Sequence, residues 1–288
     1  MTMDNSLFDE INANLRALEI DEIKKRLEPL IKGMTVASPI FDSGAFLYRA
    51  RKIGSAFRKE AGIKRSDLIY PPRHLARAGR LNRNGQPLFY CSMHKESVFF
   101  EVQDLQKGDE VILTLWKTKN RMIVNNIGYT EYVFEQLGAK RSVPQWHSGS
   151  PVRGNKQETL ALSTIPQEAI NVALSHDENR DVREALSQYF MRSVGPMDQD
   201  SYKLTTAIAE LHLGKVVSLN EEFAGVLYPS ARMWGNGDNL ALLPWFVDMH
   251  VEFRKAVHVR IDERVDTQFR VTYLDSANKF DADGNLIW

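Results

Sequence analysis

Hydrophobic residues recur every three or four positions near the start of the chain. This spacing runs through residues 6–19 and 21–32, so it predicts two amphipathic helices. Asn5 and Ser6 give a helix-start signal, and Gly33 gives a stop signal. A helical pair placed here either packs on the domain that follows or binds a partner, and packing is the simpler expectation.

Strands are predicted where apolar residues alternate with polar ones or form a short continuous run. Residues 46–50 predict a strand, and residues 109–127 alternate in the manner of a β-hairpin around a polar turn. Residues 223–228 form an apolar run typical of a buried strand, and residues 245–274 predict closing strands. The mixture of helical and strand patterns indicates an α+β fold.

A long segment between the predicted strands has a helical character. Residues 130–138 predict a short helix, and residues 139–158 are rich in Ser, Gly, Pro and basic residues, which is typical of a long loop. Residues 166–192 and 199–213 again show helical spacing. We therefore expect a largely helical insertion at about residues 130–215.

Residues 79–102 combine a turn, a strand and a short helix. Asn84 and Gly85 both tolerate positive φ, which favours a tight turn. Residues 87–91 predict a short buried strand, and residues 95–102 predict a helix with its apolar side chains toward a core. Rigid elements on both sides would hold polar side chains of this segment in fixed positions.

Two glutamates of this segment are candidates for chemistry. Glu96 and Glu101 are five residues apart, so on a helix they point in different directions and at most one faces a site. Glu101 lies between Phe100 and Val102, and we expect it to be partly buried. A partly buried carboxylate is costly unless it has a role, so Glu101 is the stronger candidate and Glu96 suits a helix start.

Arginines before and within this segment suit an anionic ligand. Arg49 and Arg51 share one face of their predicted strand, and spacing alone does not say which one faces a site. The planar guanidinium binds phosphate oxygens in pairs and keeps its charge. The basic residues 54–78 form either a solvated surface or a positively charged lid that attracts an anion.

Composition narrows the class of protein. The chain has 288 residues, 43% of them hydrophobic, and equal totals of 37 basic and 37 acidic residues. Zero net charge argues against a general nucleic-acid binder, and the absence of a long apolar run argues against a membrane span. A single cysteine, Cys91, and a polar N-terminus favour a cytoplasmic protein. The histidine spacings predict no metal site.

Three separated blocks of the sequence form a recognisable pattern. The central block has Gly79, Arg80, Asn82, Gly85, Pro87, Tyr90 and Glu101. An earlier block offers Tyr48-Arg49, and a later one offers Tyr228-Pro229-Ser230 followed by Asn239-Leu240-Ala241. Together these blocks resemble the RES domain, a family named for its Arg, Glu and Ser residues. The resemblance covers roughly residues 40–250, with the long middle segment unmatched.

This resemblance implies a fold, a division of the chain and a set of site residues. The expected fold is ADP-ribosyltransferase-like, with small β-sheets, flanking helices and the insertion. The expected units are a helical pair at residues 1–36 and a RES domain at residues 37–288. The implied catalytic residues are Glu101, Tyr90 and Ser230, and the implied NAD-binding residues are Arg49, Arg80, Asn82, Tyr90 and Ser230. Ser230 either bonds the ligand or orients Glu101.

The same resemblance implies an activity. Family members act on NAD as a substrate and need no metal, so the leading expectation is an NAD glycohydrolase or phosphorylase of the bacterial toxin type. Such a protein would be held by an antitoxin or immunity protein, and it could form a homo-oligomer. The alternatives are a mono-ADP-ribosyltransferase that modifies a protein and a non-catalytic NAD-binding module.

Overall fold

The computed structural model describes most of the chain outside the middle segment. The described residues are 6–32, 34, 36, 38–54, 62–128, 130, 177–192, 200–214, 222–233, 237–265 and 268–288. The helix predicted at residues 130–138, the loop at 139–158 and the first part of the helix at 166–192 lie outside them.

In the described part of the chain nine strands form one mixed sheet, so the α+β class is confirmed, and a single sheet stands there in place of the expected small ones. Neighbouring strands are antiparallel except for the parallel pair β5–β6. The order across the sheet is β1 (Ile40–Phe41), β5 (Met122–Asn126), β6 (Phe223–Pro229), β7 (Asp238–Leu242), β3 (Phe89–Ser92), β2 (Phe46–Lys52), β4 (Glu110–Thr118), β8 (Val251–Val265) and β9 (Gln268–Ala277).

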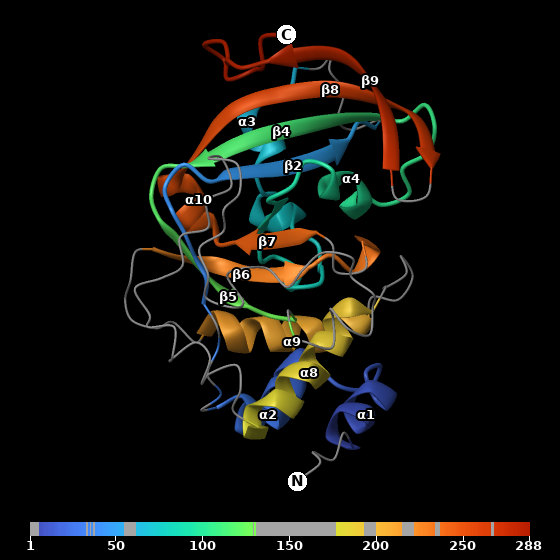
Figure 1. Ribbon diagram of the computed structural model, residues 1–288, viewed down its shortest axis with the longest axis vertical. Coiled ribbons are helices and arrows are strands. Elements are labelled where there is room, and N and C mark those ends of the chain that lie inside the picture. The colour runs from blue at the N-terminus through green and yellow to red at the C-terminus, as the bar shows by residue number, and fades with distance from the viewer. Residues whose placement is uncertain are drawn as a thin grey trace.

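Four of the described helices gather at the N-terminal end of the molecule, below β5, β6 and β7 in Figure 1. They are α1 (Ser6–Ala13), α2 (Ile20–Ile31), α8 (Asp177–Met191) and α9 (Ser201–Gly214). The shorter elements are α3 (Arg65–Leu68), α4 (Ser97–Glu101), α10 (Pro244–His250) and the 3-10 turns η2 (Arg73–Leu75) and η3 (Ala231–Met233). No described helix has the length and apolar character needed to span a membrane.

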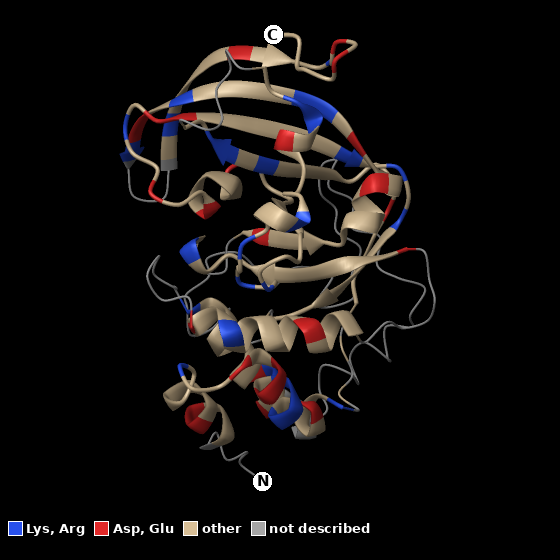
Figure 2. Ribbon diagram, turned by 180° about the vertical axis from the view of Figure 1, so that it is seen from behind, with Lys and Arg blue, Asp and Glu red and all other residues tan. Residues whose placement is uncertain are grey.

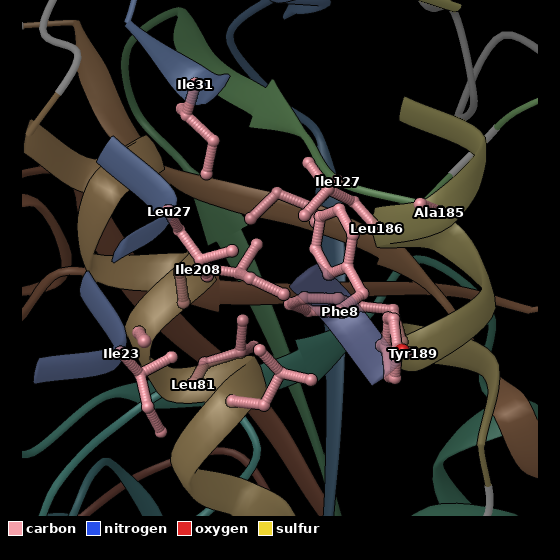
Figure 3. Packing of buried hydrophobic residues seen from close by; sticks show 14 of the residues in the cluster. Phe8, Ile23, Leu27, Ile31, Leu81, Ile127, Ala185, Leu186, Tyr189 and Ile208 are labelled. Atoms are coloured by element: carbon pink, nitrogen blue, oxygen red, sulfur yellow. The ribbon is translucent and has the colours of Figure 1, made fainter. Parts of the chain in front are cut away.

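The N-terminal helical pair packs on the rest of the molecule. Phe8 of α1 and Leu27 of α2 are fully buried in one cluster with Ile208 of α9 and Val226 of β6. Figure 3 shows side chains of α1, α2, α8 and α9 meeting in this cluster. The predicted packing is therefore confirmed, although α1 ends at Ala13, earlier than the spacing predicted.

A second core lies around Trp116, which contacts Phe89 and Phe253 edge-on. It also contains Leu240 of β7 and Phe246 of α10. Strands β6 and β7 contribute side chains to both of these clusters and therefore lie between them. Figure 2 shows acidic and basic residues interspersed along both the helices and the sheet, in keeping with equal totals of 37 each.

The β-hairpin predicted at residues 109–127 is wrong in its pairing. Both strands form, but β4 pairs with β2 and β8, whereas β5 pairs with β1 and β6. Alternation reports which face of a strand is buried, and it does not identify the neighbouring strand. The polar turn instead carries the chain from one half of the sheet to the other, and the Lys119 amide donates to the His250 carbonyl at 2.7 Å.

The strands predicted over residues 245–274 are β8 and β9, but the first residues of that range are helical. Pro244 stands at the start of α10, where a proline fits because its missing N–H needs no partner. The helix ends at His250, and β8 follows directly. The turn at Asn84 and Gly85 forms as predicted, with Gly85 at a φ of +78°.

Candidate active site

A cavity of about 430 Å³ opens where the two halves of the sheet diverge. β2 and β3 share a single paired position, Tyr48 with Ser92. Residues of both strands line the cavity beyond that point, together with residues of α4, α9, η3, β6 and β7. The volume lies within the usual range of small-molecule sites.

Glu101 is the last residue of α4, and its carboxylate is held at the cavity through one oxygen. Ser230 Oγ donates a hydrogen bond to Glu101 Oε1 at 2.5 Å, and Asn239 Nδ2 donates to the same oxygen at 2.8 Å. Both donors are almost completely buried. Within the described part of the chain Oε2 has no hydrogen bond, so it remains available to a ligand.

The expectation that Glu101 is partly buried is wrong, because the residue is exposed. α4 turns Val98, Phe99 and Phe100 into the cores and leaves its final residue at the cavity. Glu96 is at the N-terminal boundary of α4, where its side chain is 64% exposed beside Lys95. This agrees with a helix-start role for Glu96.

Ser230 does not line the cavity. Its side chain is fully buried directly after β6, and its backbone N–H donates to the Gly237 carbonyl at 2.9 Å. Of its two expected roles, the geometry supports orienting Glu101 and not bonding a ligand.

Arg49 and Arg51 both line the cavity, which answers the question left open by their spacing. Arg49 Nη1 donates to the Tyr90 carbonyl at 2.7 Å, and the guanidinium lies 5.7 Å from the Phe89 ring centre. Burial lowers the pKa of Arg49 to about 10, so the group keeps its charge at neutral pH. Its Nε is buried without a partner in the described residues. Arg51 Nη1 donates to the Asp67 carbonyl.

Arg80 lines the cavity and also binds carbonyl groups at the C-terminal end of helix α8. Its Nη1 donates to the Phe190 carbonyl at 2.6 Å, and its Nη2 donates to the Arg192 carbonyl at 3.1 Å. These oxygens lie in and just beyond the last turn of α8, where a positive charge is favourable. Arg80 therefore anchors α8 beside the cavity, and its two terminal nitrogens already have partners.

Tyr90 and Asn82 form a closed set of hydrogen bonds in the turn. The Tyr90 hydroxyl donates to Asn82 Oδ1 at 2.8 Å and accepts from the Leu81 amide at 3.0 Å. A Cβ at Gly79 would come within 2.9 Å of Asn82 Oδ1 and 3.2 Å of the Tyr90 hydroxyl, so glycine allows this close approach. The Tyr90 ring lines the cavity, whereas Asn82 does not. Burial raises the pKa of Tyr90.

The cavity lining includes residues that were absent from the site predicted by sequence, and four of them carry polar groups close to the predicted residues. They are Tyr202 of α9, Tyr228 of β6, Arg232 of η3 and Asn239 of β7. Arg232 Nη1 donates to the Phe100 carbonyl at 3.0 Å, which joins η3 to α4. Tyr228 and Asn239 could have been noticed as polar residues in otherwise apolar runs, but nothing in the sequence pointed to Tyr202.

The cavity has an excess of positive charge. Among the described residues that line it, Glu101 is the single acid, against Arg49, Arg51, Lys52, Arg80 and Arg232. Lys52 is paired with Asp109 at 2.6 Å. The hydrogen bonds of Arg49, Arg80 and Arg232 go to backbone carbonyls, which do not cancel their charge. The cavity therefore suits an anionic ligand.

No group of three or more His, Cys, Asp or Glu residues in the described ranges is arranged to hold a metal ion.

Comparison of the chain with protein-family models, with curated proteins and with solved structures found no match.

Proposed function

We propose that this protein cleaves the bond between nicotinamide and ribose in NAD. One observation carries the proposal: a carboxylate is fixed through one oxygen at a cavity that otherwise carries arginines. NAD combines a pyrophosphate with a ribose that becomes positively charged as nicotinamide leaves. The arginines match the pyrophosphate, and Glu101 matches the positive charge of the reacting sugar.

Cleavage of this bond needs little covalent catalysis by the protein. The positive pyridinium ring of NAD becomes neutral as nicotinamide departs, so it is a good leaving group. The sugar passes through an oxocarbenium-like state, and a carboxylate already held in place stabilises that state without reorganising. Ser230 and Asn239 supply the holding bonds to Glu101. Arg49 binds the pyrophosphate and fixes the reacting bond beside Glu101.

The acceptor of the ADP-ribose is water or phosphate in the leading version of this proposal. Transfer to a protein side chain is the second version, and the exposure of Glu101 favours it because an outside acceptor has access. The first activity depletes the NAD of the cell, and the second modifies its proteins. A toxin-type role with a neutralising partner protein therefore belongs to the same proposal.

Incubation of the purified protein with NAD tests the activity. We expect NAD to fall and free nicotinamide to appear with the wild type, and both effects to vanish in Glu101→Gln. Glu96→Gln is the matched control, because Glu96 is an exposed glutamate at the other end of α4. Mass spectrometry of the products identifies the acceptor. Equal activity of wild type and Glu101→Gln would refute the role of Glu101.

A further inference from the structure

Tyr228 is one of the tyrosines that line the cavity, and it stands next to Asn239, which holds Glu101. It lies directly opposite Asn239 in the antiparallel pair β6–β7, so the two side chains project from the same face of the sheet. Asn239 in turn donates to Glu101 Oε1 at 2.8 Å. Ser230, two residues after Tyr228, donates to the same oxygen. Tyr228 and the holding groups of Glu101 therefore share one small region.

The hydroxyl groups of Tyr228 and Tyr90 differ in their partners. The Tyr90 hydroxyl is occupied by Asn82 and Leu81. The Tyr228 hydroxyl has no hydrogen-bond partner within the described ranges, although the residue lines the cavity and is only 6% exposed. Its ring is backed by Phe190 of α8, with ring centres 6.4 Å apart. Tyr228 thus presents a fixed ring with an unused hydroxyl.

The Tyr228 hydroxyl is a donor at ordinary pH. Burial raises the pKa of Tyr228 well above its usual value, and the nearby charge of Glu101 raises it further. The phenol therefore stays protonated. Glu101 Oε2, by contrast, can only accept a hydrogen bond when the carboxylate is ionised.

A donor and an acceptor at the same cavity favour a ligand group that can both accept and donate. A sugar hydroxyl does both, since it has one O–H and two lone pairs. We propose that Tyr228 and Glu101 together hold a ribose hydroxyl of the substrate, with Tyr228 donating to it and Glu101 accepting from it. This inference rests on the proposed NAD activity, and it makes Tyr228 a substrate-binding residue that Tyr90 cannot replace.

Tyr228→Phe tests the inference because it removes only the hydroxyl and keeps the ring against Phe190. We expect kcat/KM for nicotinamide release to fall about tenfold, which corresponds to the loss of one hydrogen bond. The melting temperature should stay at the wild-type value, because the hydroxyl has no protein partner in the described chain. Tyr273→Phe, at an exposed residue of β9, is the matched control and should keep wild-type kinetics.

The outcomes separate this inference from the proposed activity. Wild-type kinetics in Tyr228→Phe would overturn the role of Tyr228 and leave the NAD activity standing. If the wild type releases no nicotinamide, the activity fails, and calorimetric titration with NAD then decides. About tenfold weaker NAD binding by Tyr228→Phe would support the inference, whereas equal affinity, or no binding by the wild type, would overturn it.

Discussion

At the scale of the residue, the orientation of Glu101 depends on two buried neutral donors. Ser230 and Asn239 come from the end of β6 and from β7, and both bond the same carboxylate oxygen. Hydrogen bonds to a charged group are stronger than those between neutral groups. The serine at the third block of the sequence pattern therefore acts through Glu101, and its effect on turnover should exceed its effect on stability.

Ser230→Ala should lower kcat for nicotinamide release about 10-fold to 100-fold, because Glu101 loses one of its two charge-assisted bonds. Steady-state kinetics measure the effect. Ser97→Ala is the matched control, since the Ser97 hydroxyl is also buried but has no partner in the described residues. An equal loss in both variants would show that any buried serine near α4 matters, and it would remove the specific role of Ser230.

The sequence pattern pointed to several residues in and around the cavity, but it did not predict their hydrogen-bond partners. The pattern pointed to Tyr90 and Ser230, yet the Tyr90 hydroxyl bonds Leu81 and Asn82 of the preceding turn, and Ser230 bonds Glu101 without lining the cavity. Asn239 supplies the second bond from a position 138 residues away in the chain. Such partners depend on which strands become neighbours, and local spacing carries no information about that.

At the scale of the element, Arg80 links residues 79–102 to the end of helix α8. Most of the predicted helices and strands are present in the described chain, because each one reflects a local period of hydrophobic residues. The pairing of β4 and β5 was wrong, because strand order is a property of the whole sheet. Arg80 shows the same limit, since its partners belong to a helix more than a hundred residues later.

Arg80→Met should destabilise the protein by about 1–3 kcal/mol, since two carbonyls at the end of α8 lose their donors. Chemical denaturation measures this change in the free energy of unfolding. Arg77→Met replaces an exposed arginine in the same segment and serves as the control. If Arg80→Met unfolds at the same denaturant concentration as the wild type but binds NAD weakly, Arg80 is a ligand residue instead of an anchor.

At the scale of the whole molecule, the helices and the sheet form one structure around the cavity. α1 and α2 share a core with α8, α9 and β6, so the two N-terminal helices contribute to the stability of the sheet. Arg83, in the segment of residues 79–102, forms ion pairs with Asp21 of α2 and Glu210 of α9, each at 2.5 Å. Arg83 thus joins residues 79–102 to the helices α2 and α9.

Leu27→Ala should cost about 2–5 kcal/mol of stability, because it opens a cavity in the core shared by α2 and α9. Thermal and chemical denaturation measure the loss. Lys25→Ala, at an exposed position of the same helix, should change stability little. A wild-type unfolding curve for Leu27→Ala would show that α2 is not part of the cooperative structure.

The ion pairs of Arg83 predict a pH dependence of stability. Burial opposes ionisation of Glu210, but hydrogen bonds and charges from Arg83 and Lys24 outweigh it and hold the pKa of Glu210 below its usual 4.5. A carboxyl group with a lowered folded-state pKa stabilises the fold above its usual pKa, and this contribution is lost as the pH falls below it. Unfolding curves below pH 4.5 should therefore show a steeper loss for the wild type than for Glu210→Gln. Parallel curves would contradict this.

The most direct test of the account is the rate of nicotinamide release at saturating NAD, with NAD affinity measured beside it. We predict that Glu101→Gln binds NAD about as tightly as the wild type and releases nicotinamide at least about a hundredfold more slowly, because the carboxylate acts on the developing charge. Release at the wild-type rate by Glu101→Gln would contradict the central claim. An unaltered NAD pool with the wild type, in the presence and absence of phosphate, would contradict it as well.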